Sequence, residues 1–252
     1  MNQCIGIDLG GSGFRIGLVD VIAGTIVDEP VLVEHTPSTP RSKIIENISS
    51  LLDSFPRHVP LGIGFPGVVE GHIVKTAPNL GTTWEDVDFR HHFGFDRERE
   101  VAVLNDADAA GLCEARFGAG QEKQGKMLMV TVGTGLGTAV LTSGVLTPNV
   151  ELGISPHPIH GGRIEDRASA RAKTADGLSF RQWSKVFEDA INLFIESTSA
   201  DFVILSGSIL KDWNEFEHLI QPSKPIFRAK YHDTAGIIGA AYFASANYQK
   251  TG

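Results

Sequence analysis

Near its N-terminus the chain reads CIGIDLGGSG over residues 4–13. An apolar run that ends at an aspartate and is followed at once by glycines predicts a short buried strand, Cys4 to Asp8, and a tight loop. We expect a second strand over Phe14 to Val19, a turn over Asp20 to Gly24, and a third strand over Thr25 to Val33. Glycines let backbone N–H groups approach an anion, and a neighbouring carboxylate can hold Mg²⁺. The segment therefore predicts a phosphate loop beside a metal ligand.

The same order of elements returns in the second half of the chain. Met127 to Val132 predicts a strand, Gly133 to Gly137 a glycine loop, and Thr138 to Leu141 a strand that ends at the turn Ser143-Gly144. Such a repeat indicates an internal duplication. A single glycine turn is equally typical of a tight hairpin, but the repeat favours a pair of phosphate loops.

Helical spacing of apolar residues predicts helices over Ser42–Phe55, Ser179–Ser197 and Ala235–Tyr248. Ser179 and Gln182 form the capping-box pattern at the start of the second of these helices. Strands that alternate with helices predict an α/β fold with partly parallel sheets, and duplicated halves predict a cleft for a ligand.

The boundary between the halves is expected near Asn105, where the strand Val101–Leu104 ends. We predict a small N-terminal α/β domain over residues 1–104, completed by the C-terminal helix 235–250. Residues 105–234 are then expected to form a larger C-terminal α/β domain.

The boundary segment also carries a candidate base. Asn105 and Asp106 open a helix rich in small residues, and both types are favoured helix caps. Capping needs only one of them, and Asp108 adds a third polar residue to the same turn. Phosphoryl transfer uses a base that orients the attacking hydroxyl, and a carboxylate at the end of a strand suits that role. Asp106 is therefore the candidate base.

Composition argues against several classes of protein. The formal net charge of −8 disfavours nucleic acid as a partner. We find no run of about 18 apolar residues and no leader pattern before Asp8, so we expect no membrane partner and a cytoplasmic location. Cys4 and Cys113 belong to no CxxC pair, which predicts small buried residues in a reducing compartment.

Taken together, these motifs resemble the polyphosphate glucokinase branch of the ROK (repressor–ORF–kinase) sugar kinases over essentially the whole chain. The matching segments are residues 5–13, 64–69, 105–111, 133–137, 148–153 and 165–183. The resemblance implies a duplicated ribonuclease-H-like (actin-like ATPase) fold with two domains that flank a cleft. It also implies transfer of a phosphoryl group from polyphosphate or ATP to the 6-hydroxyl of glucose or a related hexose.

The resemblance assigns roles residue by residue. Asp106 would be the base and Asp8 the ligand of Mg²⁺. The residues implied to bind sugar are Gly67, Asn79, Asn105, Asp106, Glu151 and Glu165. Those implied to bind phosphate are Gly10, Gly11, Ser12, Arg15, Thr134 and Gly135. The small-molecule partners would be a sugar and polyphosphate or ATP, and the protein would form a homodimer.

Three departures from the family pattern bear on the site. Arg15 stands where the family usually has lysine, which keeps the charge, and the family's cysteine-rich zinc motif is absent, so we expect no structural zinc. Ile154 replaces a histidine that would contact the sugar. Either His157 or His160 could supply the contact from a slightly longer loop, and otherwise we expect weak use of glucose.

The donor is indicated by a basic row. Arg163, Arg167 and Arg171 are spaced by four and would share one face of a helix, with Lys173 nearby. Guanidinium groups suit bidentate phosphate binding, although a solvated helix face explains the row equally well. The segment 206–208 carries fewer glycines than the family's adenosine motif, which favours polyphosphate over ATP. Two alternatives stay open: an ATP-dependent ROK kinase for another hexose or amino sugar, and a degenerate sugar sensor without catalysis.

Overall fold

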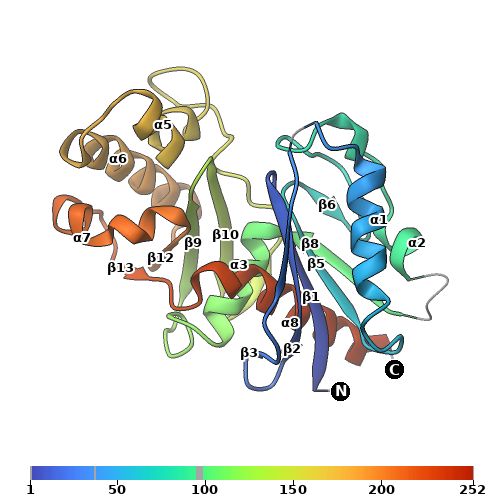
Figure 1. The fold of residues 1–252 in the computed structure, drawn as a ribbon. Coiled ribbons are helices and arrows are strands. Elements are labelled where there is room, and N and C mark those ends of the chain that lie inside the picture. The colour runs from blue at the N-terminus through green and yellow to red at the C-terminus, as the bar shows by residue number, and fades with distance from the viewer. Residues whose placement is uncertain (1, 37, 95–98, 252) are drawn as a thin grey trace. The chain divides into compact units, whose positions relative to one another are not determined.

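The computed structural model describes residues 2–36, 38–94 and 99–251. Packing divides the chain into two compact units, each with its own sheet (Figure 1). One unit runs to Cys113 and resumes at Thr234, and the other runs from Glu114 to Asp233. The division falls inside the helix that begins at Asp106, and the C-terminal helix belongs to the first unit.

The first unit is built on a six-stranded sheet in the order β3-β2-β1-β5-β8, with β4 also paired to β2. The strands are β1 (Gln3–Leu9), β2 (Gly13–Asp20), β3 (Thr25–Ile26), β4 (Val31–Glu34), β5 (Leu61–Phe65) and β8 (Val101–Asn105). β1 pairs antiparallel with β2 and parallel with β5, which pairs parallel with β8. Strands β5 and β8 are buried along their whole length, as continuous apolar runs in parallel sheets are.

Two sequence expectations for this unit are wrong in detail. The third strand, expected over Thr25 to Val33, is two separate strands, β3 and β4. Pro30 lies between them, and proline has no N–H to donate to a ladder. The helix expected to reach Phe55 is α1 (Arg41–Leu52), because Phe55 N–H donates to the carbonyl of Leu52 in a tighter turn after the helix ends.

The two faces of this sheet are covered differently. Apolar side chains of one face pack with those of α1 in the core of the unit. The helix α8 (Ala235–Thr251) lies against β1 and β5 (Figure 1). A Cβ on Gly6 or Gly62 would collide with carbonyl oxygens of α8, so the strands present bare backbone to that helix. The remaining elements of the unit are β6 (Val69–Glu70), β7 (Ile73–Val74), η1 (Thr82–Trp84), α2 (Phe89–Phe93) and the start of α3 (Asp106–Arg116).

The second unit repeats the topology of the first. Its five-stranded sheet has the order β11-β10-β9-β12-β13, and its strands are β9 (Lys126–Val132), β10 (Leu136–Thr142), β11 (Val145–Thr147), β12 (Phe202–Ser206) and β13 (Ile226–Arg228). β9 pairs antiparallel with β10 and parallel with β12, which pairs parallel with β13. The pairing matches that of β1, β2, β5 and β8, so the duplicated α/β fold is confirmed.

The longest helix of this unit is α6 (Phe180–Thr198), and the predicted capping box of Ser179 and Gln182 is present at its start. The other helical segments are α4 (Glu165–Ala168), α5 (Ala170–Ala175), η3 (Ser208–Asp212), α7 (Trp213–Phe216), η4 (Glu217–Leu219) and η5 (His232–Thr234). None of the helices that the structure describes is long and apolar enough to cross a membrane.

The expected helix through the arginine row is wrong. Ser169 has an extended backbone and caps α5, so α4 and α5 are separate short helices. Arg163 precedes α4, Arg167 lies in α4 and Arg171 lies in α5. The three side chains therefore do not share one helix face.

A buried carboxylate holds the end of α3 to a later segment of the second unit. Glu114 is fully buried, and its Oε1 accepts from the backbone N–H groups of Lys230 (2.9 Å) and Tyr231 (2.7 Å). Its Oε2 accepts from the N–H of Ala119 at 2.8 Å. The Glu114 carboxylate thus accepts hydrogen bonds from three backbone N–H groups. One of them follows it closely in the sequence, and the other two lie far along the chain.

Candidate active site

The sheet of the first unit brings its two candidate carboxylates to the same edge. In the register Asp8 pairs with Gly64, and Gly64 pairs with Leu104. The carboxyl ends of β1, β5 and β8 are therefore aligned, and α3 begins with Asp106 just beyond β8. Carboxyl ends of parallel strands are the usual ligand-binding edge of such sheets.

Asn105 both caps α3 and holds a neighbouring loop. Its Oδ1 accepts from the N–H groups of Ala107 (2.9 Å) and Asp108 (3.1 Å), and its Nδ2 donates to the carbonyl of Gly67 at 3.2 Å. The side chain is 2% exposed. The capping explanation for Asn105 is therefore confirmed, and its direct contact with sugar stays a prediction. The tie to Gly67 was not foreseen, because no local pattern links two residues so far apart.

Asp106 is half-buried and anchored by its own helix. Its Oδ1 accepts from the N–H of Ala107 at 2.8 Å. The partial positive charge of a helix N-terminus favours the ionised form of a carboxylate. Asp106 is thus held at the sheet edge in a setting that suits a base.

The first glycine loop follows β1 directly. Gly10 N–H donates to the carbonyl of Gly13 at 2.8 Å, which closes the loop tightly. A Cβ on Gly11 would lie 3.5 Å from Asn79, so this glycine brings the loop close to another predicted sugar ligand. His35 N–H fixes the loop from the other side by donating to the carbonyl of Ser12 at 3.0 Å.

The predicted metal ligand lies beside the loop. Asp8 pairs across the antiparallel register with Arg15, so opposite charges are neighbours on one face of β1 and β2. A Cβ on Gly236 would collide with the Asp8 carboxylate, so the start of α8 lies against it. Among the residues the structure describes, no three His, Cys, Asp or Glu side chains gather as a metal site. A Mg²⁺ ion bound by one or two carboxylates together with phosphate oxygens fits this set.

In the second unit, Glu165 fixes the other glycine loop. Its Oε2 accepts from the N–H of Leu136 at 3.1 Å and would collide with a Cβ on Gly135. Its Oε1 lies 3.6 Å from the Arg163 guanidinium. The half-buried Glu151 precedes Gly153, whose carbonyl accepts from the N–H of Glu165 at 2.9 Å. Both predicted sugar-binding glutamates are therefore close to this loop in the fold.

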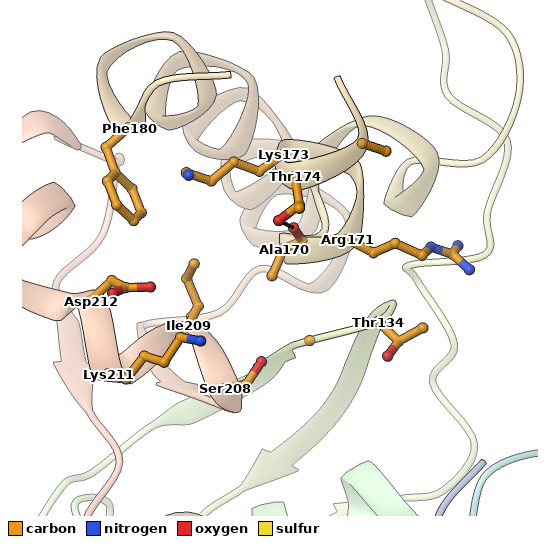
Figure 2. Close-up of a pocket in the computed structure, with 12 residues that line it drawn as sticks. Thr134, Ala170, Arg171, Lys173, Thr174, Phe180, Ser208, Ile209, Lys211 and Asp212 are labelled. Atoms are coloured by element: carbon orange, nitrogen blue, oxygen red, sulfur yellow. Dashed lines mark hydrogen bonds between the residues drawn. The ribbon is translucent and has the colours of Figure 1, made fainter. Parts of the chain in front are cut away.

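A pocket of about 470 Å³ opens beside the same loop (Figure 2). Three cationic side chains and one anionic side chain line it, together with the loop, an aromatic ring and a hydroxyl: Arg171, Lys173, Lys211, Asp212, Gly133, Thr134, Phe180 and Ser208. Arg171 N–H donates to the carbonyl of Gly133 at 3.2 Å, which ties α5 to the loop. The pocket thus combines a glycine loop with a net positive lining.

Only part of the predicted arginine row reaches this pocket. Arg171 lines it, whereas Arg163 and Arg167 are not among its lining residues, and their contact with phosphate stays a prediction. Lys211 was missed, since it lies far from the row in the sequence. The sequence signal that could have pointed to Lys211 is Gly207, which predicts a turn after the strand. Gly207 has a positive φ of 93° between β12 and η3, and Lys211 lies in η3.

The loop after Ile154 holds His157 in a defined orientation. His157 N–H donates to the carbonyl of Gly162 at 2.8 Å, and its Nδ1 accepts from the N–H groups of Ile159 and His160, each at 3.2 Å. Desolvation, His160 and Arg167 lower the pKa of His157. The imidazole is therefore neutral near pH 7, and its proton is on Nε2.

Comparisons with known proteins agree with this geometry. The profile of the ROK family matches residues 4–157. The chain is 34% identical over 245 residues to a polyphosphate glucokinase of Mycobacterium tuberculosis. The alignment covers 96% of this chain and 91% of that protein. It superposes with a TM-score of 0.89 on an inorganic polyphosphate/ATP-glucomannokinase from Arthrobacter sp. strain KM, at 34% identity over 98% of this chain and 100% of the other. A ROK family glucokinase from Streptomyces griseus, solved with glucose and AMPPNP, shares the fold with a TM-score of 0.79 at 20% identity, over 97% and 99% of the two chains.

Proposed function

Because this chain belongs to the ROK family, we propose that it transfers a phosphoryl group from polyphosphate or ATP to the 6-hydroxyl of glucose or a related hexose. The protein is a sugar kinase, a phosphotransferase with an alcohol group as acceptor. The observation that carries the finer proposal is the position of Asp106 at the start of α3, on the sheet edge that also holds Asp8.

Asp106 acts on the acceptor. Its carboxylate accepts the proton of the sugar 6-hydroxyl while that oxygen forms a bond to phosphorus. The bond from phosphorus to the bridging oxygen of the donor breaks, and the shortened donor leaves with the electron pair. Asn105 keeps the first turn of α3 and the Gly67 loop in register, so the base stays in place.

Asp8 would hold Mg²⁺ in the first unit. When bound, the ion neutralises charge on the transferred phosphoryl group. The backbone N–H groups of Gly11 and Ser12, in the loop that Gly10 closes, and those of Thr134 and Gly135 are proposed to bind phosphate oxygens, with Arg15 adding charge beside Asp8. We further propose that the protein works as a homodimer, which light scattering of the purified chain would measure.

The donor site is proposed to be the pocket of the second unit. Its lining places Arg171, Lys173 and Lys211 against the single carboxylate of Asp212. A polyanion is therefore favoured there, and screening by salt weakens such partly exposed contacts. This balance supports polyphosphate as the preferred donor.

The function is tested by one matrix of assays. Glucose, mannose and N-acetylglucosamine are each offered with polyphosphate and with ATP, and the sugar phosphate is measured. We expect the highest kcat/KM with glucose and polyphosphate, and a KM for polyphosphate that rises with salt. Turnover of another sugar with ATP alone would identify the ATP-dependent alternative, and sugar binding without turnover would identify a sensor.

His157 is expected to replace the missing family histidine. Neutral His157 offers an Nε2–H to a sugar hydroxyl, which Ile154 cannot do. His157→Ala should raise the KM for glucose about 5–150-fold, because a buried hydroxyl would lose its partner. The wild-type KM should also rise as the pH falls through the lowered pKa of His157, since a protonated Nδ1 can no longer accept from the loop.

The neighbouring exposed His160 provides the matched control, because its ring lies 4.7 Å from that of His157. His160→Ala should change the KM less than His157→Ala does. If glucose binds weakly to the wild-type protein and Ile154→His tightens binding, the histidine contact with the sugar hydroxyl is missing in the wild type. His157 then does not supply that contact. Tight binding that is indifferent to all three substitutions would show that the contact is dispensable.

A further inference from the structure

One contact in the pocket of the second unit is not explained by phosphate binding alone. The ammonium nitrogen of Lys173 lies over the ring of Phe180, 4.0 Å from the ring centroid. Both side chains line the pocket. Figure 2 shows Lys173 extended toward Phe180, whereas Arg171 extends toward the end of the pocket where Thr134 lies. The ring thus gives the lysine one defined place in the pocket.

The Phe180 ring is itself held firmly. Phe180 is the first residue of α6, directly after the Ser179 cap. Its ring lies nearly parallel to that of Phe216, at 18° with centroids 6.0 Å apart, and meets the Trp183 ring edge-on at 6.2 Å. Phe216 and Trp183 are both fully buried. Phe180 is therefore a fixed platform rather than a mobile surface ring.

An aromatic face in a donor pocket can serve two different ligands. It can stack on a nucleotide base, which is worth roughly 5–150-fold in affinity, or it can hold a cation that binds phosphate. Here the ammonium group of Lys173 covers one face of the Phe180 ring. A base can stack on that face only after the ammonium group has moved away.

We propose that Lys173 and Phe180 together set the donor preference of the kinase, in favour of a chain of phosphates over a nucleotide. The inference rests on the proposed sugar kinase function. It adds that the donor site selects polyphosphate over a nucleotide. Polyphosphate carries charge on every unit, whereas ATP carries charge only on its triphosphate. Lys173 therefore binds a phosphate at the Phe180 end of the pocket (Figure 2), where ATP would have to put its uncharged base.

The test measures kcat/KM for polyphosphate and for ATP, with glucose as acceptor. Lys173→Met keeps the length of the side chain and removes its charge. We expect a loss of about tenfold with polyphosphate, as for a hydrogen bond to a charged group. With ATP we expect a gain of about two- to fivefold, because the ring is uncovered. Lys185→Met removes an exposed lysine of α6 that does not line the pocket, and should change neither value.

Phe180→Leu then separates the ring from the charge. Alone it should lower the value for polyphosphate about two- to fivefold, because Lys173 loses its partner. Added to Lys173→Met, it should remove the gain with ATP. Thermal unfolding of each variant reports on the packing against Phe216, and Lys173→Met tests the inference without touching that packing.

Equal losses with both donors, or no loss with polyphosphate, would overturn the inference. Absence of sugar phosphate from the wild-type protein with either donor would instead overturn the proposed function. In that case, direct binding of polyphosphate and of a non-hydrolysable ATP analogue to the wild-type and Lys173→Met proteins still decides the donor preference.

Discussion

Replacement of Asp106 by Asn is expected to lower kcat for sugar phosphorylation about 10²–10⁴-fold, the usual contribution of a general base. The KM for glucose should change little, because an amide oxygen can still accept a sugar hydroxyl. Folding should also be preserved, since the new Oδ1 can accept from the N–H of Ala107 as the carboxylate does at 2.8 Å. Steady-state kinetics and glucose binding by calorimetry measure the two effects separately.

Asp28→Asn is the matched control, because Asp28 is an exposed carboxylate of the same unit and is not one of the predicted site residues. It removes the same charge and should leave kcat unchanged. An Asp106→Asn protein that keeps more than a tenth of the wild-type kcat would exclude Asp106 as the base.

Replacement of Glu114 by Ala is expected to have the largest effect on stability. The substitution leaves the partly buried N–H groups of Ala119, Lys230 and Tyr231 without their acceptor. At about 0.5–1.5 kcal/mol net for each of the three hydrogen bonds, we expect the free energy of unfolding to fall by about 2–4 kcal/mol. Chemical denaturation followed by tryptophan fluorescence measures the loss.

Glu114→Gln retains one acceptor oxygen and should lie between the wild type and Glu114→Ala. Glu122→Ala removes an exposed carboxylate from the turn that follows α3 and should be nearly neutral. Equal stability of the Glu114→Ala and Glu122→Ala proteins would show that these three hydrogen bonds contribute nothing net.

Strands that consist of apolar runs were predictable from the sequence, because their burial follows from composition alone. The positions of Asp8 and Asp106 at one sheet edge follow from that prediction. Asp8 lies at the end of one apolar run, and Asp106 comes just after another. The arginine row was misplaced because two signals compete there. Spacing by four favours one helix, whereas Ser169 is also a favoured cap, and in the structure the cap prevails.

Other features lie outside the reach of local patterns. The contact of Asn105 with Gly67 and the approach of Lys211 to the pocket join residues that are distant in the sequence. The split of the third strand at Pro30 could have been read from the proline itself. Long-range hydrogen bonds depend on the finished packing, and no periodicity encodes them.

The position of α8 in the chain constrains the order in which the protein can be built. On the ribosome the strands of the first unit emerge early, but the helix that covers Gly6 and Gly62 emerges only after all of residues 114–233. The second unit is one continuous stretch and has all its strands available together. Since domains fold as units once their sequence is complete, the half that is translated second is the first that can finish folding. Until α8 arrives, the nascent first unit carries an uncovered sheet face that only its own last helix can close.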